Sequence, residues 1–123
     1  MKGTVLVADD EADLVSFLRL NLGLSGYRVL EASTGEQALT LAKESQPDCI
    51  ILDVMMPGLD GPATLSALRS NPVTAEIPVV FLTAKAMASE IERLLGLGAR
   101  GVLTKPFDPM SLPQELKNCL GRP

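Results

Sequence analysis

Acidic residues in this 123-residue chain occur where they could hold a metal ion and accept a phosphoryl group. Asp9, Asp10 and Glu11 follow one apolar run, and Asp53 closes another. Carboxylates brought together repel one another and raise the pKa of one of them unless a cation sits among them. Oxygen ligands in an open, hydrated site suit Mg²⁺. A carboxylate beside Mg²⁺ can attack a phosphoryl group and form an aspartyl phosphate.

Two further residues at the ends of apolar runs fit the same chemistry. Thr83 can donate its hydroxyl to a phosphoryl oxygen, and Lys105 can neutralise another as a point charge. Phosphoryl transfer depends on positioning and charge neutralisation more than on covalent machinery. Taken singly, acids at a helix start, a threonine at a strand end and a lysine have ordinary structural explanations. Asp53 is harder to explain in this way, because a carboxylate closing an apolar strand needs a partner or water.

The composition excludes several classes of protein. The net charge is −4, from 11 basic and 15 acidic residues without a Lys/Arg cluster, which disfavours direct nucleic-acid binding. No apolar run is long enough for a membrane span, and the N-terminus does not resemble a signal peptide, so we expect a cytoplasmic location. The absence of histidine excludes Ser-His-Asp triads and histidine-bearing zinc sites. Cys49 is expected to be buried, and a disulfide with Cys119 stays open.

Short apolar runs alternate with segments of helical spacing. The expected strands are the runs 4–8, 27–32, 49–54, 77–83 and 100–104. The expected helices cover about 14–22, 35–42, 61–70, 88–97 and 109–120. Thr34 and Asp60 are expected to cap the second and third helices. Pro113 is tolerated only near a helix start, so the regular part of the last helix is expected to begin after Pro109.

This alternation predicts an α/β fold with a doubly wound parallel sheet of five strands, covered by helices on both faces. The length fits a single domain over 1–123. No DNA-binding domain follows it, so we expect any output to pass through protein contacts. In the strand order 2-1-3-4-5, the ends of strands one, three, four and five lie side by side. The acids, the threonine and the lysine then converge on one rim.

The chain resembles the receiver domain of two-component response regulators and is chemotaxis-regulator-like. The matching segments are VLVADDE, LDVMMPGLDG, VVFLTA and LTKPF, which occur in the family's order and cover essentially the whole chain. The family fold is a flavodoxin-like (βα)5 three-layer sandwich with the strand order 2-1-3-4-5. The resemblance implies a signalling domain that catalyses only its own phosphorylation and dephosphorylation.

The resemblance also implies a role for each acidic residue. Asp53 corresponds to the phosphoacceptor. Asp10 corresponds to a direct ligand of Mg²⁺ (or Mn²⁺), and Asp9 to a ligand that acts through water. The backbone carbonyl of Met55 corresponds to the group that completes the metal site together with Asp53.

The remaining site positions follow from the later motifs. Thr83 and the backbone of Ala84 correspond to groups that contact the phosphoryl oxygens, with Thr83 as the switch hydroxyl. Lys105 corresponds to the family's phosphoryl-binding lysine, and the Lys105-Pro106 bond is typically cis in the family. One position departs from the pattern: Val102 stands where the family usually has Tyr or Phe. The aromatic half of the family's conformational switch is therefore absent.

The resemblance implies protein partners. The donor would be a phosphohistidine on a sensor histidine kinase or a phosphotransfer protein. The output would be a downstream protein target or further domains, with a phosphorylation-dependent dimer through the fourth helix, fifth strand and fifth helix. Apolar residues on several sides of the first helical segment, Val15 and Phe17 among them, suit a kinase helix. Generous core packing explains them equally well.

Three alternative functions were weighed. An Mg²⁺-dependent phosphatase with an aspartyl-phosphate intermediate usually has a second Asp two residues after its nucleophile, where this chain has Met55. A flavin or nucleotide binder on the same fold needs a Gly/Ser/Thr loop after the first strand, where this chain has three acids. A receiver-like interaction module that is never phosphorylated is kept open by Val102.

Overall fold

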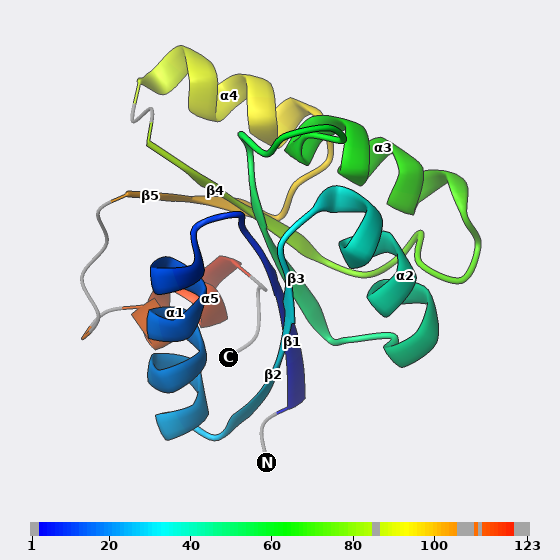
Figure 1. Cartoon of the computed structure of the whole chain (residues 1–123). Helices are drawn as coiled ribbons and strands as arrows, with labels where there is room; N and C mark the ends of the chain where they lie inside the picture. Colours follow the sequence, from blue (N-terminus) through cyan, green and yellow to red (C-terminus); the bar gives the residue numbers. More distant parts are fainter. Residues whose placement is uncertain (1–2, 85–86, 106–109, 111, 120–123) are drawn as a thin grey trace.

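The computed structural model in Figure 1 describes residues 3–84, 87–105, 110 and 112–119. Residues 118 and 119 are described by their backbone alone. The described part of the chain contains the strands β1 (Gly3–Ala8), β2 (Tyr27–Ala32), β3 (Cys49–Asp53), β4 (Val79–Thr83) and β5 (Gly101–Thr104). Its helices are α1 (Ala12–Leu24), α2 (Gly35–Ser45), α3 (Gly61–Ser70), α4 (Ala88–Gly96) and α5 (Leu112–Cys119). The strands form one parallel sheet in the order β2-β1-β3-β4-β5, which confirms the predicted fold class and strand order.

Helices cover both faces of the sheet, as Figure 1 shows: α1 and α5 lie on one side, and α2, α3 and α4 on the other. Side chains of a strand alternate between the two faces. In β3, Cys49 and Ile51 pack in the core on the α1 and α5 side, whereas Ile50 and Leu52 pack in the core on the opposite side. The central strands therefore need apolar residues at nearly every position, which explains their unbroken apolar runs.

The two predicted helix caps are present. The Thr34 hydroxyl accepts a hydrogen bond from the backbone N–H of Gln37 at 3.1 Å. The Asp60 carboxylate accepts one from the N–H of Ala63 at 2.9 Å. Each bond satisfies one of the N–H groups that a helix start leaves without an internal partner. Both helix starts were thus encoded locally in the sequence.

Proline residues lie at the starts of β4 and α5. The run 77–83 is strand only from Val79, and the carbonyl of Pro78 accepts the N–H of Ile50 at 2.9 Å. Proline has no N–H to contribute to a ladder, so the strand begins after it. Helix α5 begins at Leu112 with Pro113 as its second residue, which confirms that its regular part starts after Pro109.

The apolar residues of α1 divide between core and surface. Val15, Leu18 and Leu22 are buried against the sheet, whereas Phe17 and Leu20 are exposed. None of the described helices has the length and apolar character needed to span a bilayer. The side chain of Cys49 is buried, as the sequence predicted.

Replacing Gly23 with Ala is expected to raise the free energy of unfolding by about 0.5 kcal/mol. Gly23 lies in the last turn of α1, and a methyl group there would meet no atom within 4 Å. Alanine restricts the unfolded chain without strain in the helix. Urea unfolding measures the change. The matched control is Gly98→Ala, because Gly98 has open space but a φ of +107° that L-residues rarely adopt. Equal effects of the two substitutions would contradict the argument.

Candidate metal and phosphoryl site

The carboxyl ends of four strands meet at one edge of the sheet. Asp9 follows β1, Asp53 is the last residue of β3, Thr83 is the last residue of β4, and Lys105 follows β5. The strand register holds these ends level, because Asp53 pairs with Leu82 of β4 and Thr83 pairs with Thr104 of β5. The structure thus brings together residues that are widely separated in the sequence. We call this edge, with Asp10 and Glu11, the acidic rim.

Three carboxylates of the acidic rim form a cluster. Oxygen atoms of Asp9, Asp10 and Asp53 all lie within 4.8 Å of one another. Asp9 and Asp53 are buried, with exposed fractions of 1% and 3%, and Asp10 is exposed. The backbone holds Asp9 in place: its N–H donates to Ala32 at 3.1 Å, and its Oδ1 accepts the N–H of Glu11 at 2.9 Å. Two negative charges therefore face each other beneath the surface, with a third at the opening.

Burial and its neighbours set the charge of Asp53. Burial, and after it the nearby charge of Asp9, raise its pKa from the ordinary value of 3.8 to about 6. The Lys105 ammonium and the N–H of Met55, which donates to Oδ1 at 3.3 Å, act in the opposite direction and favour the carboxylate. At neutral pH the Asp53 side chain is therefore mostly ionised, but its charged form is less stable than it would be in water. A cation among the carboxylates would remove that unfavourable charge.

Lys105 is the counter-charge of the rim. Its Nζ lies 3.2 Å from Oδ2 of Asp9, 3.1 Å from Oε1 of Glu11 and 3.5 Å from Oδ1 of Asp53. Its backbone N–H donates to the carbonyl of Thr83 at 2.8 Å, which fixes the start of the side chain. Burial lowers the pKa of Lys105, but the hydrogen bond to Glu11 and the charges of Asp9 and Asp53 outweigh it and raise the pKa overall. The ammonium therefore stays protonated across the physiological range.

The other predicted site residues surround this centre. Thr83 is buried at the end of β4, and Ala84 beside it is exposed. Met55 is 71% exposed, and its backbone N–H donates a hydrogen bond to Oδ1 of Asp53. The metal contact of its carbonyl stays a prediction. The predicted cis bond involves Pro106, which lies outside the described residues.

Val102 occupies the position at which the sequence departs from the family pattern of Tyr or Phe. It lies in β5 opposite Phe81 of β4, is partly buried and packs against the core on the α2, α3 and α4 side. A side chain of this size fills its own site in the sheet and has no ring to swing between two positions. An aromatic switch at this position is therefore excluded.

Sequence reasoning missed Gly61, the first residue of α3. Its N–H donates to the carbonyl of Val54 at 3.0 Å. A Cβ atom here would overlap the carbonyl oxygen of Asp53 and lie 2.8 Å from Cα of Val54. Only glycine lets the start of α3 pack this closely against the segment that carries Asp53. The Asp60-Gly61 pair signals a turn, but nothing local signals this long-range approach.

Sequence reasoning also gave Glu11 no role of its own. Its carboxylate contacts Lys105, a residue 94 positions away. Glu11 is the N-cap residue of α1, but its side chain makes no capping hydrogen bond. Position alone suggested only a favourable charge at a helix start.

The donor set fits a magnesium ion. Within the described residues, Oδ2 of Asp9 is buried and has no hydrogen-bond partner, so its only neutralising contact is the ion pair with Lys105. Carboxylate oxygens on two buried residues and one exposed residue provide hard ligands at a hydrated opening. Mg²⁺ prefers such ligands and retains several waters.

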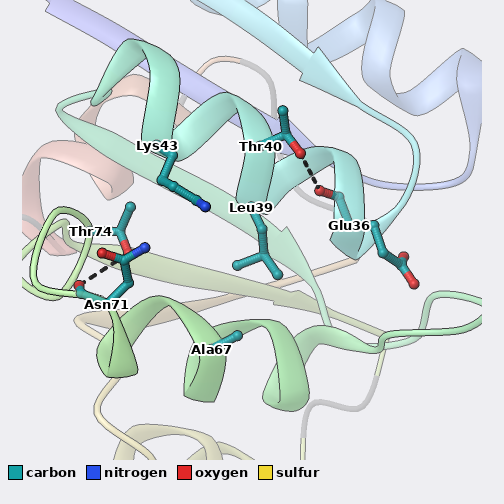
Figure 2. A pocket seen from close by; sticks show the side chains of 7 residues that line it. All are labelled: Glu36, Leu39, Thr40, Lys43, Ala67, Asn71 and Thr74. Atoms are coloured by element: carbon teal, nitrogen blue, oxygen red, sulfur yellow. Dashed lines mark hydrogen bonds between the residues drawn. The ribbon is translucent and has the colours of Figure 1, made fainter.

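A hollow of about 310 Å³ between α2 and α3 is lined by a different set of residues. Figure 2 shows Leu39 directed toward Ala67 across it. Its hydroxyl groups close local turns: Thr40 donates to the carbonyl of Glu36 at 3.2 Å, and Thr74 donates to that of Leu68 at 2.7 Å. These hydroxyl groups are occupied in local hydrogen bonds and are not directed to a ligand by any contact within the described residues.

The fold and the rim agree with a comparison against known families. Residues 5–117 match the family described as the response regulator receiver domain. The chain belongs to this family and is a receiver domain of the two-component response regulators, a class of signalling domain.

Known proteins of this class resemble the chain along its whole length. It is 43% identical over 124 residues to the alkaline phosphatase synthesis transcriptional regulatory protein PhoP of Bacillus subtilis, covering 99% of this chain and 50% of that protein. A putative response regulator from Chloroflexus aurantiacus has a TM-score of 0.91 at 36% identity, covering 99% of this chain and 100% of that one. The chain spans about half the length of the curated relatives it matches.

A third relative carries a metal ion. The receiver domain of sensor histidine kinase PA1611 from Pseudomonas aeruginosa has a TM-score of 0.87 at 28% identity, covering 98% of this chain and 99% of that one. Its structure is described with a magnesium ion coordinated in the active site cleft.

Proposed function

We propose that Asp53 accepts a phosphoryl group from a phosphohistidine of a sensor histidine kinase or a phosphotransfer protein, in a reaction that requires Mg²⁺ or Mn²⁺. The observation that carries this proposal is the buried Asp53 carboxylate, which lies within 4.8 Å of oxygens of Asp9 and Asp10 and 3.5 Å from Nζ of Lys105. Ionised at neutral pH and next to a fixed positive charge, it is suited to attack a phosphorus atom.

The contacts of Oδ1 of Asp53 support Oδ2 as the attacking oxygen. Oδ1 accepts the N–H of Met55 and faces Lys105, so Oδ2 is the nucleophile. As the Oδ2–P bond forms, the P–N bond of the donor breaks and its electron pair stays on the imidazole nitrogen. That nitrogen takes a proton from solvent, and Asp53 becomes a mixed anhydride of its carboxyl group and phosphate. A later attack by water on phosphorus restores the carboxylate and releases inorganic phosphate.

The metal would be held by Asp10, Asp53 and the Met55 carbonyl, with Asp9 acting through water. When bound, it supplies positive charge that neutralises the carboxylates and the phosphoryl oxygens. Lys105 would bind one phosphoryl oxygen as a point charge. Thr83 would donate its hydroxyl to a second oxygen and the backbone N–H of Ala84 would contact a third, as expected for catalysis by positioning.

Signal output would pass through protein contacts. We propose that the chain, 1–123, acts as one receiver domain in the cytoplasm, joined to or binding a downstream target. A phosphorylation-dependent dimer through α4, β5 and α5 is part of this proposal. The exposed side chains of Phe17 and Leu20 on α1 offer an apolar surface for a kinase helix. The chain covers 50% of PhoP of Bacillus subtilis, a transcriptional regulatory protein, so any nucleic-acid output would come from further domains.

Incubation with Mg²⁺ and acetyl phosphate is expected to add one phosphoryl group to the wild type, measured by intact mass. Asp53→Asn should gain none, because an amide cannot attack phosphorus at this position. Chelation with EDTA should abolish the gain. Glu44→Gln, which removes an exposed charge on α2, should be labelled like the wild type. Equal labelling of Asp53→Asn would refute the assignment. An unlabelled wild type would favour the interaction module that is never phosphorylated.

A further inference from the structure

Lys105 has fewer donors than its neighbours will require after phosphorylation. An ammonium group carries three N–H groups, and three carboxylates already lie within 3.5 Å of Nζ. A phosphoryl group on Asp53 brings its oxygens within reach of the same ammonium. One of the present carboxylates must then give way.

Glu11 is the carboxylate that is easiest to displace. Its side chain is 63% exposed, whereas the side chains of Asp9 and Asp53 are 0% and 5% exposed. Water can replace the ammonium at an exposed carboxylate with little loss, so such ion pairs are weak. Asp9 is buried and fixed by the N–H of Glu11, and releasing it would leave a buried charge without a partner.

Resting on the proposed function, we propose that Glu11 is a displaceable counter-ion, which holds the Lys105 ammonium before phosphorylation and competes with the phosphoryl group for it. Glu11 is thus a positioning residue that acts through Lys105. The Glu11 carboxylate therefore weakens the binding of phosphoryl oxygens to the acidic rim. Removing its charge should therefore strengthen anion binding at Asp53.

Displacement of Glu11 has a consequence at the surface. The Glu11 side chain makes no capping hydrogen bond, so moving it away from Lys105 removes no cap from α1. Phosphorylation would release one negative charge into solvent at the start of α1. This change needs no aromatic ring at Val102, so the counter-ion supplies a phosphorylation-dependent surface in a chain without the aromatic switch.

The test compares beryllofluoride binding in the presence of Mg²⁺ for the wild type, Glu11→Gln and Glu11→Asp, measured by calorimetry. Beryllofluoride mimics a phosphoryl group on Asp53 without turnover. Glu11→Gln should bind about two- to fivefold more tightly, as expected for the loss of one competing exposed ion pair. Glu11→Asp keeps the charge but is one methylene shorter, so it should also bind more tightly. Asp13→Asn removes another exposed acid from the first turn of α1 and should match the wild type.

Several results would overturn the proposal. An equal gain in Asp13→Asn would show a general effect of surface charge, and wild-type affinity in Glu11→Asp would show that contact with Lys105 is irrelevant. The affinity for Mg²⁺ alone is a second readout: a loss of more than about tenfold in Glu11→Gln would make Glu11 part of the metal site. Unfolding in EDTA checks that each variant is folded. A wild type that binds no beryllofluoride would overturn the proposed function as well, whereas equal binding by wild type and Glu11→Gln would overturn this inference alone.

Discussion

Replacing Asp53 with Asn is expected to raise the free energy of unfolding of the metal-free protein by roughly 2–3 kcal/mol at about pH 8. In the folded protein the pKa of Asp53 is raised from 3.8 to about 6, chiefly by burial and then by the charge of Asp9. The ionised side chain is therefore less stable in the folded state than in the unfolded chain. Asparagine has a similar shape and carries no charge, so it removes this penalty.

The sign of the pH dependence follows from the two pKa values. Below about 3.8, Asp53 is protonated in both states and contributes nothing to the pH dependence. Between 3.8 and about 6, the folded protein keeps a proton that the unfolded chain releases, so stability falls as pH rises. Above about 6 the penalty is complete and constant. The stability advantage of Asp53→Asn should therefore grow across this window and then level off.

Urea unfolding of wild type and Asp53→Asn in EDTA, at several pH values from about 4 to 8, measures this difference. Glu44→Gln removes the same unit of charge from an exposed site on α2. An effect that is seen with Asp53→Asn and absent from Glu44→Gln belongs to the acidic rim. A difference between wild type and Asp53→Asn that stays the same at all pH values would show that Asp53 ionises normally.

The buried carboxylates of the acidic rim lower the stability of the metal-free protein. Repulsion between Asp9 and Asp53 is unfavourable for folding alone, yet the fold places both side chains in a buried position. A cation that binds the folded protein recovers stability by mass action. Adding Mg²⁺ should therefore narrow the gap between wild type and Asp53→Asn.

The fold was predictable because its signals are local or periodic. Thr34 and Asp60 carry their cap chemistry in their own side chains, and both cap bonds are present. Strands β3 and β4 are buried on both faces, so their apolar runs are continuous in the sequence. The start of β4 was less clear, because Ile77 is apolar and buried without being strand. An apolar residue such as Ile77 indicates burial. Whether it belongs to the strand also depends on Pro78, which follows it and has no N–H for the sheet.

The rim was predictable as a set of strand ends and not as a set of contacts. Strand order alone brings Asp53, Thr83 and Lys105 to one edge. It does not say which carboxylate the ammonium touches, and Glu11 reaches Lys105 across 94 residues. The close approach of Gly61 to Asp53 depends on the path of the loop before α3. Such contacts arise from the packing of distant segments, which sequence spacing does not record.

Replacing Lys105 with Met is expected to lower the free energy of unfolding by about 2 kcal/mol at about pH 8, and by clearly less at about pH 5. Lys105 is the counter-charge of buried Asp9 and Asp53, and its own side chain is 20% exposed. Removing one partner of a fully buried ion pair costs about 3–5 kcal/mol, and partial exposure to water reduces this value. Methionine preserves the apolar stem, so the loss reports the missing charge.

The pH dependence of Lys105→Met separates charge from packing. Without the ammonium, which favours the ionised carboxylate, the pKa of Asp53 should rise further above 6. The free energy of unfolding should then continue to fall as the pH rises above about 6, because folded Lys105→Met keeps the proton on Asp53 to a higher pH than the wild type does. At about pH 5 the proton on Asp53 replaces the lysine as the neutralising charge, and most of the loss should disappear.

A double-mutant cycle with Asp53→Asn completes the test. If Lys105 acts by neutralising Asp53, removing the lysine should cost less in the Asp53→Asn background than in the wild type, as for residues in direct contact. Lys105 also contacts Asp9, which is present in both backgrounds, so part of the cost should persist. A loss that is equal at about pH 5 and 8, and equal in both backgrounds, would show that Lys105 does not stabilise the fold by neutralising Asp53. Its contact with the acceptor would then matter for the phosphorylated state alone.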